Sequence, residues 1–397
     1  MSSWRFSNFY FFYFTTIGVI VPYWSVYLQY LGFNAAQIGE LVAILVATKL
    51  VGPNIIAGFA DRISLRRGHS LGVLRLATGA TFAIFCLMYA IEPSTSDEAS
   101  QYSLVALITF GFSLFWNACV PQMEAATLNH LAHERYKYGS IRLWGSVGFI
   151  VAVVSLSYLI ECMGPSVILP FAVACIFAMF VSSFGLIARP LNKKTDIAIV
   201  PLRSLLNRKV VIILLLCSLM QISHAPFYTF FSIYLEGYGY DKSAIGWLWS
   251  LGVAVEVLVF LLGYKFLRHY RLTSLLSFTF LVAAIRWCLL AQFPENLVVL
   301  AATQIMHAVT YGLYHSVMIQ LVDQFFKGRY QIRGQALYVA ISFGVGGSIG
   351  SALSGYIWSS FGANSLFLWA GVLMFIATLL SWGLVHSREE SLPIREL

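Results

Sequence analysis

Residues 41–60, LVAILVATKLVGPNIIAGFA, decide the fold class of this chain. The stretch is apolar apart from a few polar residues and one lysine, and its length matches the roughly 20 residues with which an α-helix crosses a bilayer. A strand of a membrane barrel would instead show about ten residues in which apolar and polar side chains alternate. Because lipid offers no hydrogen bonds to an exposed backbone, the stretch predicts a transmembrane helix.

Similar apolar stretches follow one another along the whole chain. With 59% hydrophobic and 11% charged residues, the composition is typical of an integral membrane protein. About twelve stretches are long enough to span a bilayer, and they predict an all-α integral membrane fold. No small-residue cleavage site follows the first stretch, so we expect a retained helix. The predicted spans are residues 8–31, 38–60, 69–91, 102–129, 139–160, 166–189, 209–235, 243–266, 273–293, 297–324, 334–358 and 364–386.

The charged residues predict how these spans are oriented. The formal net charge is +8, and with the N-terminus in the cytoplasm Lys242 is the one basic residue of the outer loops. This asymmetry follows the positive-inside rule. It predicts a multi-pass protein of a bacterial-type inner (plasma) membrane with both termini in the cytoplasm. The expected surroundings are therefore the lipid bilayer, and the basic charge does not indicate a nucleic-acid partner.

The longest hydrophilic interval divides the chain near its midpoint. We predict an N-terminal six-helix bundle over residues 1–190, a cytoplasmic linker over 191–208, and a C-terminal six-helix bundle with a short tail over 209–397. Two pseudo-symmetric bundles of this kind are a known architecture of transporters that bind their substrate near the middle of the bilayer.

A few ionisable residues fall inside the predicted spans. A charged side chain at the centre of a bilayer costs at least ~2.5 kcal/mol on insertion scales, so each one is a candidate functional residue. Lys49 stands twelve residues before Asp61, which places it ~18 Å from the cytoplasmic end of its helix at about 1.5 Å per residue. The remaining candidates are His224, Glu256, Arg286 and His307 near mid-span, and Glu124 and Arg142 in the cytoplasmic third of their spans.

Two interpretations of these charges are open. Opposite charges on successive helices, Glu124 with Arg142 and Glu256 with Arg286, are typical of structural ion pairs. A buried ion pair stabilises a fold less than apolar packing does, which favours a role in transport instead. In that role a carboxylate exchanges its arginine partner for a proton or a substrate. Either histidine could be a packing residue held by hydrogen bonds or a part of the site.

The segment GFADRISLRRG, residues 58–68, resembles the signature loop between the second and third spans of the major facilitator superfamily. The resemblance implies two six-helix bundles that exchange between conformations. It also implies that Asp61, Arg62, Arg66 and Arg67 gate this exchange at the cytoplasmic ends of the helices. The corresponding segment of the second half, GYKFLRHYR, keeps the glycine and the basic residues but lacks the aspartate.

The acid and arginine at positions 124 and 142 are similar to the pair that binds sugar in the lactose permease group. In the same order, Glu256, Arg286 and His307 resemble that group's sugar-contacting acid, its arginine and its histidine. Three positions depart from the pattern. Gln304 replaces a lysine, Thr310 replaces the proton-carrying glutamate, and Phe149 replaces the tryptophan on which the sugar stacks. These departures argue against lactose as the substrate.

A closer resemblance, over essentially the whole chain, is to the phenylpropionate (3-phenylpropionic acid) transporter family of the same superfamily. It rests on long strings such as VPYWSVYL in the first span, YGSIRLWGSVGF in the fifth and IGWLWSLGVAVEV in the eighth. The resemblance implies proton-driven uptake of an aromatic monocarboxylate. The residues fit that chemistry, because lysine and arginine side chains bind carboxylates and aromatic side chains line small-molecule pockets. Candidate aromatic walls are Trp24, Phe149, Tyr228, Trp247 and Trp249.

The sequence hypothesis is therefore a secondary active transporter that works by alternating access, with Lys49, Arg142 and Arg286 holding an anion. The proton-linked group is Glu256 or Glu124, with His307 as a further candidate, and His224 completes the substrate-binding set. We expect a proton gradient as the energy source, no cofactor, no metal ion and a functional monomer.

Other functions are weighed against this hypothesis. One is proton-coupled symport of a neutral sugar or a nucleoside, and another is export of a drug or metabolite. A transporter-like sensor or a membrane enzyme is a further class. For an enzyme we would expect a nucleophile with its base or a metal-ligand cluster. His130 and His133 lie in a predicted loop without the carboxylate spacing that a metal site requires.

Overall fold

The computed structural model describes residues 3–67, 71–91, 93, 98–131, 134–187, 208–326 and 330–385. Every regular element in these ranges is a helix. Twelve of the helical segments are long and apolar enough to cross a membrane, which confirms the predicted number of spans. The predicted linker lies outside the described residues except for Arg208.

The chain divides into two compact units. The first comprises Met1–Thr195, Phe227–Ser250 and Ser351–Ser359, and the second comprises Asp196–Pro226, Leu251–Gly350 and Ser360–Leu397. Three helices therefore contribute residues to both units. The proposed bundle boundaries at residues 190 and 209 stay a prediction.

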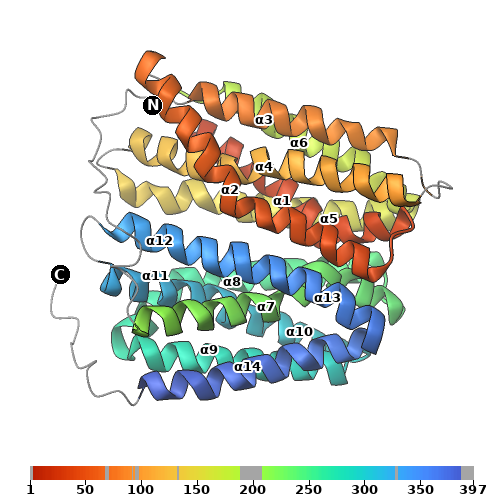
Figure 1. The fold of residues 1–397 in the computed structure, drawn as a ribbon, viewed down its shortest axis with the longest axis vertical. Helices are drawn as coiled ribbons and strands as arrows, with labels where there is room; N and C mark the ends of the chain where they lie inside the picture. The colour runs from red at the N-terminus through yellow and green to blue at the C-terminus, as the bar shows by residue number, and fades with distance from the viewer. Residues whose placement is uncertain are drawn as a thin grey trace. The chain divides into compact units, whose positions relative to one another are not determined.

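The first unit is built on α1, which lies beside α5 and α6, while α2 packs against α4 (Figure 1). Much of α1 is buried, including Trp24 and four aromatic residues near its start, Phe6, Phe9, Tyr10 and Tyr13, as expected for a helix surrounded by others. The helices of the first half are α1 (Trp4–Tyr30), α2 (Ala35–Arg67), α3 (Leu71–Phe85), α4 (Glu98–Leu131), α5 (Tyr138–Met163) and α6 (Ile168–Phe184).

In the second unit, α9 is the common neighbour of α10, α11 and α14. The tenth and eleventh spans are not continuous α-helices. A π-helical turn, Ala308–Leu313, joins α10 to α11, and another, Ala340–Gly346, joins α12 to α13. The helices of the second half are α7 (Arg208–Gly237), α8 (Lys242–His269), α9 (Leu272–Gln292), α10 (Leu297–His307), α11 (Tyr314–Phe325), α12 (Gln331–Val339), α13 (Gly347–Phe361) and α14 (Ala363–Val385).

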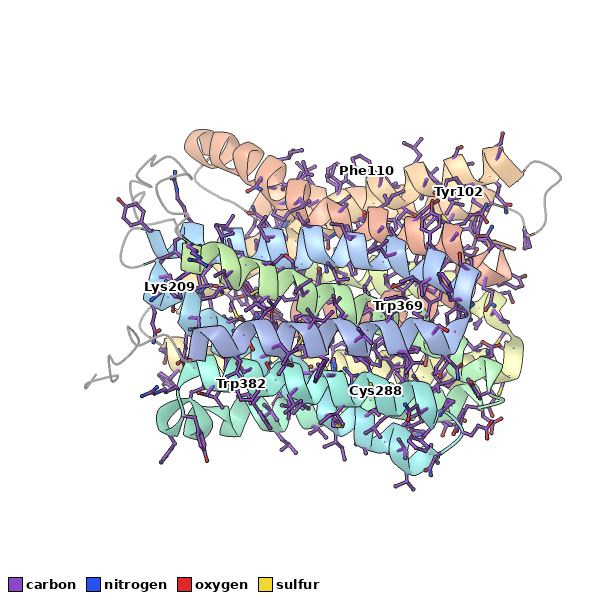
Figure 2. All side chains as sticks on the ribbon, turned by 60° about the horizontal axis from the view of Figure 1, so that its bottom comes forward. Tyr102, Phe110, Lys209, Cys288, Trp369 and Trp382 are labelled. Carbon is purple, nitrogen blue, oxygen red and sulfur yellow. The ribbon has the colours of Figure 1, made fainter. Side chains whose placement is uncertain are left out.

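Large apolar side chains cover the outside of the helices. Phe110, Trp369 and Trp382 are each about half-exposed, and Figure 2 shows them on the outer faces of their helices. A soluble protein rarely exposes so many aromatic and aliphatic side chains, whereas lipid-facing surfaces consist of them. This is the surface expected of a multi-pass membrane protein.

One element differs from the sequence expectation. Residues 58–67 were expected in a loop between the second and third spans, but α2 continues through them to Arg67. The expectation of a loop was wrong because the charged run from Asp61 to Arg67 contains neither proline nor glycine, and Gly68 is the first residue that ends helices readily. The side chains of Asp61, Arg62, Arg66 and Arg67 lie outside the described part of the structure.

Within the first unit, α2 and α13 approach closely where both carry glycine. A Cβ atom added to Gly39 would lie 2.7 Å from the carbonyl oxygen of Ser351 and 2.9 Å from the Cα atom of Gly355. Next to this contact, the Glu40 carboxylate accepts hydrogen bonds from the hydroxyls of Tyr102, at 2.6 Å, and Tyr356. The two glycines allow the backbones to meet, and the carboxylate then ties α13 to α2 and α4.

Candidate functional site

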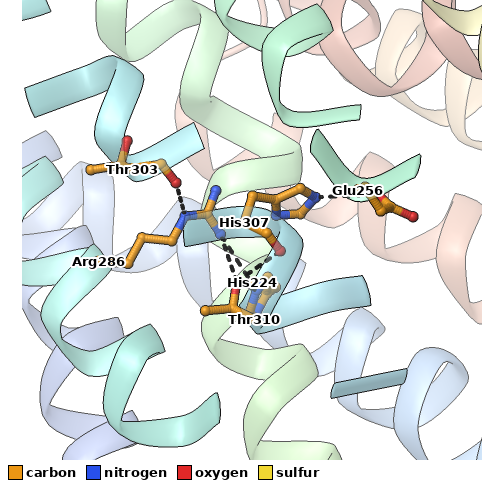
Figure 3. A network of polar contacts seen from close by, with 6 residues as sticks. All are labelled: His224, Glu256, Arg286, Thr303, His307 and Thr310. Carbon is orange, nitrogen blue, oxygen red and sulfur yellow. Dashed lines mark hydrogen bonds and ion pairs between the residues drawn. The ribbon is translucent and has the colours of Figure 1, made fainter. Parts of the chain in front are cut away.

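The second unit contains a buried arginine at the centre of a polar network. Arg286 on α9 is fully buried. Its Nε donates to the backbone carbonyl of Thr303 at 2.8 Å, and its Nη1 donates to the Thr310 hydroxyl at 3.3 Å (Figure 3). The guanidinium carbon also lies 4.2 Å from the centre of the Trp287 ring, a distance at which a cation is attracted to an aromatic face. These contacts hold the guanidinium in one position.

His224 on α7 supports this arginine as a neutral side chain. Its Nδ1 lies 2.9 Å from the carbonyl oxygen of Met220, which only accepts, so we assign the ring proton to Nδ1. The other ring nitrogen, Nε2, is then an acceptor. It lies 3.2 Å from the Thr310 hydroxyl and 3.5 Å from Arg286 Nη1. His224 is therefore a positioning residue for Arg286 and Thr310.

Thr310 of this network lies in a π-helical turn. In an α-helix, positions 303, 307 and 310 already share one face. The wider turn from Ala308 to Leu313 begins directly after His307 and contains Thr310. Such turns interrupt the regular ladder of a helix and are frequent at functional sites.

Glu256 on α8 and His307 on α10 form a second part of the same site. The carboxylate Oε2 of Glu256 lies 4.0 Å from Nε2 of His307 (Figure 3). The side chain of His307 is 7% exposed and that of Glu256 is 17% exposed, so the acid is the more accessible of the two. Gly312 makes room for the acid, because a Cβ atom there would lie 3.3 Å from Cγ of Glu256. The separation is longer than a hydrogen bond, so the acid and the base are close neighbours without a direct hydrogen bond between these two atoms.

Lys49 belongs to the first unit, where its neighbour Thr48 anchors α2 to α4. The Asn117 side-chain amide donates to the Thr48 hydroxyl at 2.8 Å and to the Leu45 carbonyl at 3.0 Å, and Thr48 also bonds to Ser113. Lys49 itself is half-buried, and within the described residues its ammonium group has no hydrogen-bond or ion-pair partner. The anchored helix thus carries a cation that has no counter-charge among the residues that the structure describes.

Glu124 and Arg142 do not form the ion pair that one interpretation of the sequence expected. The hydroxyl of Tyr138 donates to the Glu124 carboxylate at 3.3 Å. The guanidinium carbon of Arg142 lies 3.9 Å from the centre of the Phe14 ring. In the described part of the chain neither residue has an ion-pair partner. The ion-pair interpretation is therefore wrong for this pair. Glu124 contacts Tyr138 of α5, and Arg142 contacts Phe14 of α1.

The candidate aromatic walls have different surroundings. Trp24 is fully buried and packs against Phe85 and Tyr27, and Phe149 is buried where α5 meets α1. Trp249 is buried as well, and its indole nitrogen donates to the Ser232 hydroxyl at 3.0 Å. These three side chains have the contacts of core residues. Tyr228 is half-buried beside Phe227, and Trp247 is half-exposed and donates to the Tyr158 hydroxyl at 3.3 Å.

The sequence did not identify Thr303 and Thr310 as partners of the arginine. Thr310 was noted only because an acid was expected there, and Thr303 contributes through its backbone carbonyl, which no sequence pattern reveals. The available signal was their spacing of three to four residues from His307, which places them on the same helix face.

Comparison with known families assigns most of the chain to one family. A family model described as the MFS_1 like family matches residues 3–369. A protein named "Probable 3-phenylpropionic acid transporter" from Escherichia coli (strain K12) is 27% identical over 372 residues, which cover 92% of this chain and 93% of that protein. "Maltose permease" from Geobacillus stearothermophilus is 24% identical over 379 residues, covering 94% of this chain and 92% of that one.

A solved structure shows the same fold. The crystal structure of the nucleoside transporter NupG superimposes with a TM-score of 0.82 at 15% sequence identity, covering 98% of this chain and 100% of that one. The predicted all-α membrane fold of the major facilitator type is thereby confirmed, and so is the resemblance to the phenylpropionate transporter family.

Proposed function

The chain belongs to the MFS_1 like family, and we propose that it carries a small aromatic monocarboxylate across the membrane together with a proton. It is a membrane transporter of the major facilitator type and not an enzyme. The observation that carries the proposal is the buried Arg286 guanidinium beside the Glu256 and His307 pair. One group binds an anion and the other binds a proton.

Arg286 supports an anionic substrate. A guanidinium stays charged in every protein environment, and burying it costs several kcal/mol unless other groups compensate. Its contacts with Thr303, Thr310 and Trp287 hold the guanidinium in place. A carboxylate would add the charge-assisted, two-point hydrogen bond that arginine forms best. We propose Lys49 and Arg142, which both belong to the first unit, as further cations that bind an anionic ligand.

Glu256 and His307 support coupling to protons. We propose that the pair binds one proton on the outer side of the membrane and releases it on the inner side, so that the gradient drives uptake. Within this scheme Glu124 is a second candidate carrier, since its carboxylate is held by one neutral partner, Tyr138. His224 takes no proton, because both ring nitrogens are engaged in its neutral form.

The remaining parts of the scheme come from the chain as a whole. We propose alternating access between two six-helix bundles, with both termini in the cytoplasm of a bacterial cell and a monomer as the working unit. Asp61, Arg62, Arg66 and Arg67 stand at the end of α2 and would gate the cytoplasmic side. Tyr228 and Trp247 are the two aromatic candidates that are not buried.

Uptake by proteoliposomes tests the proposal. Radiolabelled 3-phenylpropionate, maltose and uridine are supplied side by side, with an inward proton gradient and with the gradient collapsed by an ionophore. We expect concentrative uptake of the carboxylate alone, and only with the gradient. Lys49→Ala should weaken uptake, whereas Lys209→Ala at the start of α7 should not. Accumulation of maltose or uridine instead of the carboxylate would overturn the substrate assignment.

A further inference from the structure

Gln304 on α10 is a buried polar residue next to the network of Figure 3. Its side chain is fully buried, and its Nε2 donates to the Thr303 hydroxyl at 3.2 Å. That hydroxyl already donates its own proton to the carbonyl oxygen of Leu300 at 2.7 Å, so toward Gln304 it can only accept. The partner therefore fixes the orientation of the amide, with nitrogen facing Thr303 and Oε1 on the other side.

The amide oxygen lacks the donor that a buried acceptor requires. Within the described residues, Oε1 of Gln304 is buried and has no hydrogen-bond partner. Leaving such an oxygen unpaired costs about as much as a lost hydrogen bond, so folded proteins normally provide a donor. Here the donor must come from outside the described protein groups.

Helix α8 leaves space for that donor because residue 252 is glycine. A Cβ atom added to Gly252 would lie 3.5 Å from Oε1 of Gln304 and 3.6 Å from Cδ2 of His307. These are ordinary van der Waals distances. Because residue 252 is glycine, no side chain at this position covers Oε1 of Gln304 from the side of α8.

We infer that Oε1 of Gln304 accepts a hydrogen bond from a hydroxyl group of the transported anion, with that hydroxyl lying beside Gly252. This inference rests on the proposed function, because it concerns which carboxylates the Arg286 site selects. Thr303 links the two groups, since its backbone carbonyl accepts from Arg286 and its hydroxyl accepts from Gln304. The substrate class is then a hydroxylated aromatic monocarboxylate.

The expected selectivity follows from the cost of an unpaired acceptor. A site built to pair with a hydroxyl rejects an analogue that lacks it, because binding the analogue leaves the buried oxygen without a donor. An unpaired group of this kind costs about 1–3 kcal/mol, so the hydroxylated acid should bind roughly 5- to 150-fold more tightly than its unsubstituted analogue.

Calorimetric titration of the purified protein tests the inference. The probes are 3-phenylpropionate, its three ring-hydroxylated isomers and 3-hydroxy-3-phenylpropionate. Two variants are compared with wild type: Gln304→Leu removes the acceptor, and Gly252→Ala adds a methyl group 3.5 Å from the acceptor oxygen, next to the proposed hydroxyl. Gly139→Ala in α5 is the matched control, since a Cβ atom there meets nothing within 4 Å.

We expect at least one hydroxylated acid to bind wild type about tenfold more tightly than 3-phenylpropionate. In Gly252→Ala and Gln304→Leu the ratio of the two affinities should fall to about one, whereas Gly139→Ala should keep the wild-type ratio. All three variants should bind 3-phenylpropionate with an affinity similar to that of wild type. Equal binding of all probes by wild type, or an unchanged ratio in both variants, overturns the inference and leaves the proposed function standing. If wild type binds none of the carboxylates, the proposed function fails first and the inference fails with it.

Discussion

At the scale of single residues, the geometry around Arg286 depends on the guanidinium and not only on its charge. Nε and Nη1 donate in two directions, to the Thr303 carbonyl and to the Thr310 hydroxyl, and the planar group also lies over Trp287. A lysine has one ammonium group and no flat face, so it cannot make these contacts together. The residue therefore acts as a rigid anion-binding group.

We expect Arg286→Lys to raise the KM for the carboxylate by about tenfold or more, although the positive charge is retained. Initial rates of uptake at several substrate concentrations measure the change. Arg271→Lys is the control, because Arg271 is exposed at the start of α9. A KM equal to that of wild type would show that any cation suffices at position 286.

The two histidines of the site should respond differently to substitution. His224 is held neutral by Met220 and Thr310, whereas His307 lies 4.0 Å from the Glu256 carboxylate. Removing a charge partner from an acid shifts its titration by about one pH unit or more. His307→Gln should therefore move the midpoint of the pH–rate profile by about that amount, and His224→Gln should lower the rate at every pH without moving the midpoint. A shifted midpoint in His224→Gln and an unshifted one in His307→Gln would contradict these assignments of the two histidines.

At the scale of helices, the contact between α2 and α13 depends on glycine. A methyl group at Gly39 would lie 2.7 Å from the Ser351 carbonyl oxygen, so Gly39→Ala forces the helices apart. Overpacking of this kind costs about 1–3 kcal/mol, and we expect a lower melting temperature in a tryptophan-fluorescence scan. Gly72→Ala in α3 meets nothing within 4 Å and should melt at or above the wild-type temperature. Equal melting temperatures for the two variants would mean that this contact adds no stability.

The helices also show what sequence patterns predict well and what they miss. Apolar length predicted the spans, because a bilayer imposes one minimum length on every helix that crosses it. The extension of α2 to Arg67 was missed, since charged residues outside the apolar stretch carry no hydropathy signal. The two π-helical turns were missed as well, because a π-turn depends on how a helix packs and not on one residue type.

At the scale of the whole molecule, the sequence predicted the membrane class, the fold and the set of buried charges. Arg286, His307 and Glu256 could be proposed because ionisable residues at bilayer depth are rare and costly. How the charged residues are arranged could not be predicted. Thr303 binds Arg286 through its backbone carbonyl, and Glu124 accepts from Tyr138 instead of pairing with Arg142. Gln304 was noticed only as a departure from a family pattern. That its Oε1 has no donor among the described residues could be seen only in the structure.

The central claim is that substrate and proton move together through the Glu256 site. The most direct measurement uses proteoliposomes loaded with a pH-sensitive dye and no imposed gradient, to which an aromatic monocarboxylate is added outside. The account predicts that the lumen acidifies as the wild-type protein carries the substrate inward. It also predicts that Glu256→Gln abolishes the acidification while substrate exchange across the membrane continues. Substrate entry without any acidification by the wild-type protein would contradict the account.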